Sequence, residues 1–304
     1  MEKIFIVDCY SILFRTYYTA EHMKTSYGVP VGGVFGFIRT LFSLIEKHKV
    51  QNIIIAMDSG KKTFRNEIFT QYKANRTETP TNLIPQFGIL NEFLQCAKIP
   101  HIQKDGFEAD DVIASIVEKH KKEKKLTIVT SDKDLMQLVC DQVECLDFFK
   151  DKFFHYQDVI EKFGVKPEYI VDYLALVGDT SDNIPGVKGC GKQGAAKLIN
   201  QFGNLENILA NIENIPNGKL KEALSKYSKD GILSKKLASL NYSVPLEENQ
   251  TFVMENIDFP AIGSFLEKYE MKSLINLMNK VFKNLNKEVL IEEAKKENIQ
   301  FQLI

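Results

Sequence analysis

Residues 3–8 read KIFIVD, a short apolar run that ends in aspartate and sets the pattern for the first half of the chain. The runs NIIIAMD at 52–58 and LTIVT at 126–130 repeat it, and the third is followed at once by Ser-Asp-Lys-Asp. Between these runs, residues 31–48 and 108–121 carry apolar side chains at helical spacing. Because strands that alternate with helices indicate βαβ units, we expect an α/β fold with a mostly parallel sheet flanked by helices.

The second half of the chain is different. From about Pro167 it lacks strand-like alternation and reads as a series of short helices, interrupted by Gly178, a glycine-rich stretch at 186–194 and Pro245. A length of 304 residues is also about two domains' worth of chain. The sequence therefore predicts a second, helical domain.

Composition excludes several classes of protein. Hydrophobic and charged contents of 44% and 26% are those of a globular protein. The longest strictly apolar run, residues 53–57, is far short of the roughly 20 residues that span a bilayer, so we expect no membrane partner. The N-terminus does not read as a signal peptide, and five cysteines without CxxC spacing favour a reducing, cytoplasmic location.

Acidic residues gather at positions where an α/β fold binds ligands. Asp8, Asp58 and Asp132 stand at or just after the ends of expected parallel strands, the edge at which ligands bind in open α/β sheets. The other acids come in tight groups: Glu108, Asp110 and Asp111; Asp134, next to Lys133; and Asp179 with Asp182. Each has a plainer explanation, because aspartates cap helices and acids in a first turn favour the helix dipole. Glu108 and Asp111, three residues apart, are expected to share one helix face.

Together the nine acids would require cations. Two unit charges 4 Å apart repel by about 4 kcal/mol at an effective dielectric constant near 20. Carboxylates without histidine or cysteine suit Mg²⁺ or Mn²⁺ better than zinc. Apart from these nine, 31 acids face 39 bases, so a chain of net charge −1 still has a basic remainder that can bind phosphate.

The stretch GVKGCGKQG at 186–194 matches two nucleotide-binding patterns by accident. The P-loop pattern fails at Gln193, where a hydroxyl should reach magnesium, and both it and the dinucleotide pattern need a preceding strand that is absent here. Helix-hairpin-helix spacing fits better: one helix would close at Pro185-Gly186, residues 189–191 would form the hairpin, and Ala195 would begin the next helix's apolar face. Such a hairpin holds a phosphate through backbone N–H groups. An ordinary glycine turn remains the alternative.

Five motifs then carry a family resemblance. VDCYSILFRTYY, AMDSGKKTFRNEIFTQYKANR, GFEADD, TSDKDLMQLV and LVGDTSDNIPGVKGCGKQGAAKLI occur in the order seen in bacterial 5′ nucleases. Over about residues 1–285 the chain resembles the 5′–3′ exonuclease domain of DNA polymerase I, within the flap endonuclease superfamily. The resemblance implies a PIN-like catalytic domain at 1–172 with a helical arch at about 61–91. It further implies a helix-three-turn-helix DNA-binding domain at 173–285, and residues 286–304 would be a tail or linker.

The resemblance also assigns roles to residues. All nine acids would bind metal, with Asp179 and Asp182 at the second of two sites. Lys73, Arg76 and Arg15 would act on the phosphate that is cut. Arg65 would contact DNA at the arch, and Tyr72 is a candidate for stacking on a base. DNA binding at the hairpin would involve Lys188, Gly189, Gly191, Lys192 and Lys197, with a potassium ion also held there.

The implied activity is hydrolysis of DNA by a two-metal mechanism, with Mg²⁺ or Mn²⁺, on substrates that have a free 5′ end. Removal of primers and flaps, fused to or beside a DNA polymerase, is the implied role. A PIN-type ribonuclease and a catalytically inactive DNA-binding scaffold are the alternatives. In the resembling family the hairpin usually reads Gly-Ile-Gly-x-Lys-Thr-Ala, whereas here Lys192-Gln193-Gly194 shifts the lysine and loses a hydroxyl. This change bears on how strongly the hairpin would hold a duplex.

Overall fold

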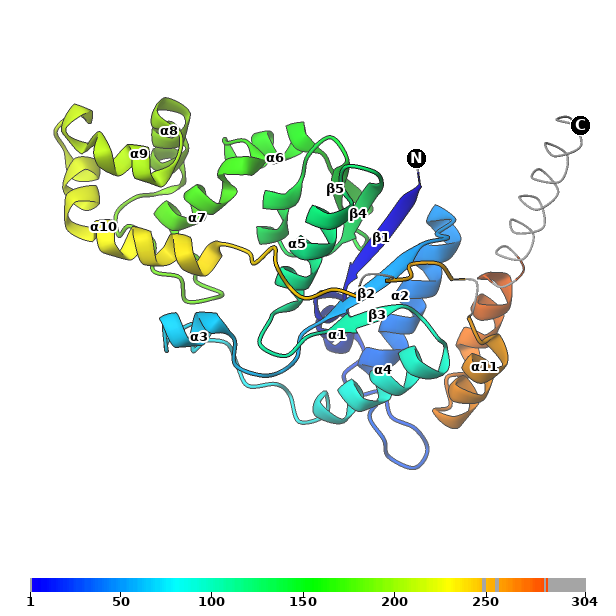
Figure 1. Cartoon of the computed structure of the whole chain (residues 1–304). Coiled ribbons are helices and arrows are strands. Elements are labelled where there is room, and N and C mark those ends of the chain that lie inside the picture. The colour runs from blue at the N-terminus through cyan, green and yellow to red at the C-terminus, as the bar shows by residue number, and fades with distance from the viewer. Residues whose placement is uncertain (1, 248–249, 255–256, 282, 284–304) are drawn as a thin grey trace, which may run out of the picture.

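A six-stranded sheet lies at the centre of a computed structural model that describes residues 2–247, 250–254, 257–281 and 283 (Figure 1). Its strands are β1 (Lys3–Asp8), β2 (Ile53–Met57), β3 (His101–Gln103), β4 (Lys125–Val129), β5 (Val143–Asp147) and β6 (Lys152–Phe154). The order across the sheet is β3-β2-β1-β4-β5-β6, and every neighbouring pair is parallel except β5 with β6. The expectation of a mostly parallel sheet is confirmed.

Alternate residues of β1 face two separate hydrophobic cores. Ile4 and Ile6 join one core, and Phe5 and Val7 join the other. All four side chains are buried, as in a parallel sheet that helices cover on both faces. The apolar runs in the sequence predicted the central strands for this reason.

Helices cover both faces of the sheet. On the Phe5 face lie α1 (Cys9–Thr19), α2 (Gly32–His48), α4 (Ile84–Cys96) and α11 (Phe259–Lys268), with the short η4 (Lys272–Leu274). On the Ile4 face lie α5 (Ala109–His120), η1 (Asp134–Leu138), α6 (Tyr156–Phe163), η2 (Pro167–Tyr169) and α7 (Ile170–Val177). Within the described chain, no helix is both long and apolar enough to cross a membrane.

The predicted helical region extends the core on the Ile4 face to one side of the sheet (Figure 1). It comprises α8 (Lys192–Phe202), α9 (Leu205–Ala210), η3 (Ile212–Asn214) and α10 (Lys219–Ala238), which has non-helical backbone at Tyr227. The helix before the hairpin was expected to close at Pro185-Gly186, but α7 already ends at Val177. Gly178 forces that end, because its φ of +75° and the close approach of the Ile184 carbonyl leave no room for a side chain.

The end of the second domain at residue 285 stays a prediction, but the chain returns to the sheet before that residue. The Ile53 N–H donates to the Phe252 carbonyl (2.7 Å), and Phe265 of α11 packs on Phe93 of α4 with ring centroids 5.4 Å apart. The chain therefore returns to the sheet, where Phe252 joins the core on the Ile4 face and the described residues from Met254 onward cover the Phe5 face. The expected tail at 286–304 lies outside the described residues.

The expected helical arch at 61–91 has little helix. It contains α3 (Phe64–Ile68), turns up to Arg76, and the first half of α4, which begins at Ile84. Arg65 and Tyr72 hold it against α5, as described below. The arch that the family resemblance implied stays a prediction, and in this structure residues 69–83 are turns and irregular chain.

Candidate active site

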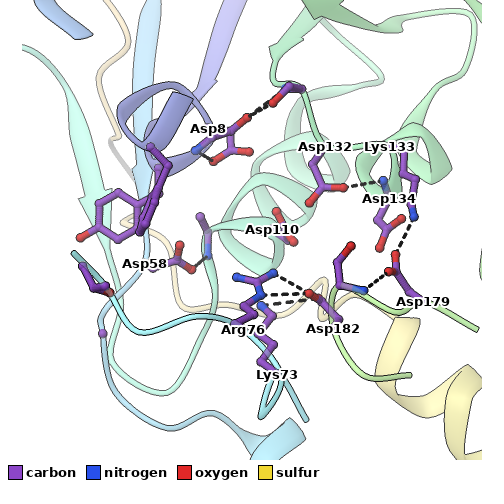
Figure 2. A pocket seen from close by; sticks show the side chains of 18 of the residues that line it. Asp8, Asp58, Lys73, Arg76, Asp110, Asp132, Lys133, Asp134, Asp179 and Asp182 are labelled. Carbon is purple, nitrogen blue, oxygen red and sulfur yellow. Dashed lines mark hydrogen bonds and ion pairs between the residues drawn. The ribbon is translucent and has the colours of Figure 1, made fainter. Parts of the chain in front are cut away.

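Seven of the nine predicted acids line one cavity of about 1010 Å³ at the C-terminal edge of the central strands (Figure 2). They are Asp8, Asp58, Asp110, Asp132, Asp134, Asp179 and Asp182. Asp8 ends β1, Asp58 follows β2, and Asp132 and Asp134 follow β4. Asp110 comes from the first turn of α5, and its side chain lies in the middle of the group in Figure 2.

Two of these aspartates also satisfy N–H groups at helix starts, as the plainer explanation predicted. Asp8 accepts the Ser11 N–H at 3.2 Å through one oxygen and the Thr130 hydroxyl at 2.7 Å through the other. Asp58 accepts the Ala109 N–H at the start of α5 (2.8 Å). These bonds fix the side chains while leaving lone pairs on their oxygens for a further ligand.

Burial and mutual repulsion disfavour the ionised form of the acids in the cavity. Burial, followed by repulsion from Asp132 and Asp58, raises the pKa of Asp8 to about 7. Burial and the charges of Asp132 and Asp179 raise the pKa of Asp134 to about 8. The pKa of Asp110 is also well above its usual value, chiefly through burial. A bound cation would remove this penalty.

The donor atoms suit a divalent cation. All are hard carboxylate oxygens, and Asp134 Oδ1 is buried without a hydrogen-bond partner. As the side chains lie, however, no three acidic, histidine or cysteine side chains among the described residues converge closely enough to hold a metal ion. The residues therefore fit divalent metal in their chemistry, and binding would require some of them to rotate.

Basic side chains share the cavity. Lys73 Nζ lies 2.8 Å from Glu108 Oε1, and Arg76 donates to Asp182 from Nε (3.1 Å) and Nη2. Lys133 Nζ lies 2.7 Å from Asp179. Burial opposes the shift, but the ion pair with Lys133 lowers the pKa of Asp179. Sequence reasoning named Lys73 and Arg76 but missed Lys133, although it stands between two of the acids.

Arg65 and Asp111 are not where the resemblance put them. Arg65 is 1% exposed and Asp111 is fully buried, so neither faces the cavity. The two Nη atoms of Arg65 each donate to Asp111 at 2.8 Å, and Arg65 also donates to the carbonyls of Leu237 and Ser239. In this structure Arg65 and Asp111 form a buried ion pair, and the DNA-binding role of Arg65 and the metal-binding role of Asp111 stay predictions.

Glu108 and Tyr72 lie behind the wall of the cavity. The Tyr72 hydroxyl donates to Glu108 (3.1 Å) and contacts Asp182 (3.2 Å), and only 5% of Tyr72 is exposed. The ring is enclosed by the protein in this structure, and stacking of Tyr72 on a base stays a prediction. Glu108 Oε1 instead faces Lys73, and Glu108 acts on the cavity through that lysine.

Arg15 also points elsewhere. Its guanidinium lies 4.4 Å from the centre of the Phe149 ring and 3.6 Å from Asp147, and Arg15 does not line the cavity. The side chain is held by the end of β5, a strand that the sequence reasoning did not predict. Its placement beside the phosphate that is cut is therefore not supported.

An aromatic wall borders the acids and was missed from the sequence. Tyr10, Phe14 and Phe87 all line the cavity, with the rings of Tyr10 and Phe87 5.0 Å apart. Tyr10 and Phe14 are four residues apart on α1, directly after Asp8. That i, i+4 spacing was the available signal, because it places both rings on the helix face beside the first aspartate.

The hairpin has the expected exposure. Gly189 has φ +96°, the Cys190 N–H donates to the Val187 carbonyl (2.8 Å), and Gly191 precedes α8. Lys188, Lys192 and Lys197 are exposed and make no ion pair with any described residue. DNA binding by this group stays a prediction.

Two family profiles match consecutive parts of the chain. The first is described as 5′-3′ exonuclease, N-terminal resolvase-like domain, and covers residues 3–164. The second is described as 5′-3′ exonuclease, C-terminal SAM fold, and covers residues 165–259. The chain belongs to the 5′-3′ exonuclease family. It is a nuclease of that family, and the resemblance seen in the motifs is confirmed.

The chain matches relatives of two different lengths. The 5′-3′ exonuclease of Aquifex aeolicus is 36% identical over 95% of this chain and 100% of its own length. The DNA polymerase I of Borreliella burgdorferi is 38% identical over 98% of this chain but only 32% of its own length. This family member thus spans all of the first relative and about a third of the second.

Solved structures share its fold. The T5 5′-exonuclease with divalent metal ions (zinc) bound is 25% identical, with a TM-score of 0.68 over 91% of this chain and 100% of that one. The catalytic core of Rad2 in complex with DNA substrate is 19% identical, with a TM-score of 0.61 over 91% of this chain and 92% of that one. The fold of an α/β nuclease core with a helical second domain is therefore established for this family member.

Proposed function

We propose that the chain is a structure-specific 5′ nuclease, acting as a 5′–3′ exonuclease and flap endonuclease on DNA with two divalent ions. The observation that carries this proposal is the cavity in which seven carboxylates and the cations Lys73, Arg76 and Lys133 converge. Mg²⁺ is the proposed ion, with Mn²⁺ as a substitute, because all the donors are hard oxygens. The metal-bound T5 exonuclease, a relative in fold, supports a divalent site.

The acids divide into two groups that would hold the ions. Asp8, Asp58, Asp110, Asp132 and Asp134 come from the ends of β1, β2 and β4 and the start of α5, whereas Asp179 and Asp182 come from the loop after α7. Bound metal would supply a hydroxide-like nucleophile and stabilise the leaving 3′ oxygen. The protein's own contribution is to hold these oxygens within one cavity and to keep the substrate phosphate between them.

Lys73 and Arg76 would stabilise the negative charge that develops on the phosphoryl oxygens. Both are held by acids of the site, Glu108 and Asp182, and the Lys73 N–H donates to the Asp182 carbonyl at 3.0 Å. The Asp182 backbone and the Lys73 side chain are therefore positioned together. Electrostatic groups fixed in this way need little reorganisation during the reaction.

Recognition of DNA would use two surfaces. The exposed hairpin residues Lys188, Gly189, Gly191, Lys192 and Lys197 would bind duplex backbone, which carries no sequence information. A potassium ion at the hairpin is proposed here on the family resemblance alone. The aromatic wall offers stacking partners to a base beside the cut, and stacking is tolerant of sequence.

A cellular role follows from the relatives and is likewise proposed. Matches to about a third of several bacterial DNA polymerase I chains support primer and flap removal in replication and repair, in the cytoplasm, with the nuclease fused to or working beside a polymerase. No further partner is needed for the chemistry.

Cleavage of a 5′-labelled flap duplex tests the proposal. We expect short 5′ products with Mg²⁺, none with EDTA, and none from Asp132→Asn, while the control Asp105→Asn cleaves normally. Asp105 pairs with Lys61 and does not line the cavity, so it controls for loss of an acid as such. Binding of the flap without cutting would indicate a scaffold, and preference for an RNA strand would indicate a ribonuclease.

A further inference from the structure

One lysine of the cavity differs from the others. Lys162, on α6, lines the cavity with the acids, yet its ammonium group makes no ion pair with any described residue. Lys73, Arg76 and Lys133 are each paired with Glu108, Asp182 or Asp179. Lys162 Nζ instead lies 3.6 Å from Met136 Sδ and 4.9 Å from the centre of the Phe154 ring.

The aromatic contacts hold this side chain in place. Its Nζ is also 5.3 Å from the centre of the Phe163 ring, so the end of the side chain lies against two aromatic residues while it remains exposed. A lysine whose end is already held in place loses less conformational entropy when it binds an anion. A cation without an acidic partner also has no internal ion pair to give up.

Lys162 stands beside the contact between α6 and the helix that follows the hairpin. Helix α6 ends at Phe163, and the carbonyl of the next residue, Gly164, accepts a hydrogen bond from Asn200 in the last turn of α8 (2.9 Å). The other end of α8 begins at the hairpin. Lys162 therefore stands on the side of the cavity where α6 contacts the helix that follows the hairpin. Lys73 and Arg76 come from the segment after β2, on the other side of β1 and β4 in the sheet.

We propose that Lys162 binds a backbone phosphate of the DNA duplex between the acidic cavity and the hairpin, at least one nucleotide away from the phosphate that is cut. This inference rests on the proposed nuclease function and adds to it a residue that positions the substrate. The ammonium group would act as a point charge toward one phosphate oxygen. It would not take part in breaking the bond, because Lys73 and Arg76 are the cations assigned to the phosphate that is cut, and they pair with Glu108 and Asp182.

Salt dependence of binding separates this role from a structural one. Each phosphate contact that is lost makes the slope of log K against log[salt] shallower by about 0.7–0.9. For Lys162→Met, with a flap duplex in EDTA, we expect this change and about tenfold weaker binding at low salt, the size of one charged hydrogen bond. Lys162→Arg should restore both values. The matched control is Lys150→Met, because Lys150 is paired with Asp147 at 2.8 Å and does not line the cavity.

Substrates with one neutral methylphosphonate linkage locate the contact. The affinity of each substrate is measured for wild type and for Lys162→Met, so that each linkage and the Lys162 substitution form a double-mutant cycle. When the neutral linkage is the one that Lys162 contacts, between the cut and the hairpin-bound duplex, Lys162→Met should no longer weaken binding. An equal loss at every linkage, or an unchanged salt slope, would overturn the proposal.

Two further outcomes are distinguishable. If wild type neither binds nor cuts the flap, the proposed function itself fails. If wild type cuts, but Lys162→Met changes only the Mg²⁺ concentration needed for half-maximal rate, Lys162 acts on the acids and the phosphate contact is refuted. A fall in melting temperature in Lys162→Met that Lys162→Arg reverses without restoring DNA binding would also refute it.

Discussion

The Nη1 and Nη2 atoms of Arg65 each lie 2.8 Å from one carboxylate oxygen of Asp111, and both side chains are almost completely buried. Arg65 also donates to the carbonyls of Leu237 and Ser239 at the end of α10, and the Asn241 N–H donates to Asp111. The pair thereby joins the segment after β2, helix α5 and the helical domain at a single point. A residue grouped with the metal ligands by its motif is thus part of the contact between the two domains.

We predict that Arg65→Ala and Asp111→Ala each lower the free energy of unfolding by about 3–5 kcal/mol, because each leaves a buried charge unpaired. Urea denaturation in EDTA measures this without any contribution from metal. The double variant Arg65→Met/Asp111→Leu should lower the free energy of unfolding by much less than the sum of the two single changes. In the double variant no charge is left uncompensated. An Asp111→Ala protein of normal stability that needs more Mg²⁺ for activity would instead support a ligand role.

The acidic cavity predicts the opposite effect on stability. Asp134→Asn removes one of several mutually repelling carboxylates, so it should raise the melting temperature of the metal-free protein, by about 2–4 °C for each kcal/mol gained. It should also reduce the stabilisation given by Mg²⁺, which for an intact site is about 2.7 kcal/mol at 100 times the dissociation constant. Thermal melts with EDTA and with Mg²⁺ measure both effects, with Asp105→Asn as the control. Lower stability of Asp134→Asn in EDTA would contradict the repulsion argument.

The same charges give the metal-free protein a defined pH dependence. Burial and neighbouring acids raise the pKa of Asp8 to about 7 and of Asp134 to about 8 from an ordinary value of 3.8. Between pH 4 and 8 the folded state therefore binds more protons than the unfolded state, and stability falls as pH rises. We expect a higher melting temperature at pH 6 than at pH 8 in EDTA. Because metal binds the deprotonated acids, saturating Mg²⁺ should remove or reverse this trend.

The sequence predicted those strands whose residues form a clear local hydrophobic pattern. The strands β1, β2 and β4 were predictable because their residues are apolar and buried on both faces of the sheet. The strands β3 and β6 have three residues each, too short for any periodicity to stand out. The edge strand β6 pairs antiparallel, which the βαβ pattern gave no reason to expect.

The sequence predicted those site residues whose position at the end of a strand fixes where the side chain points. Asp8 and Asp58 face the cavity because they follow parallel strands that end at one edge. Glu108 and Asp111 share a helix face, but the spacing could not say what covers that face. Their partners lie far along the chain, at Arg65 and at the end of α10, and only the tertiary fold brings these together.

Lys73 offers a test of the proposed charge stabilisation. Lys73→Met keeps the length of the side chain but removes the ammonium group that faces Glu108. We predict that kcat falls by about 10²–10³, the usual cost of removing one electrostatic group of an active site, with a smaller change in KM. Single-turnover cleavage of the flap duplex measures this. The control is Lys61→Met, since Lys61 pairs with Asp105 outside the cavity. A loss confined to KM would place Lys73 in DNA binding only.

The aromatic wall leads to the last prediction. The ring of Phe87 lies 5.0 Å from that of Tyr10 and lines the cavity with the acids, so a base next to the cut could stack there. Phe87→Leu keeps an apolar side chain but removes the π-face, and should weaken binding by about 1–3 kcal/mol for one base. The loss should be similar for all four bases and should vanish on a substrate with an abasic nucleotide at that position. Exposed Phe149, which lies under Arg15 away from the cavity, provides the control Phe149→Leu. If Phe87→Leu weakens the abasic and normal substrates equally, the ring supports the cavity wall and does not stack on the substrate.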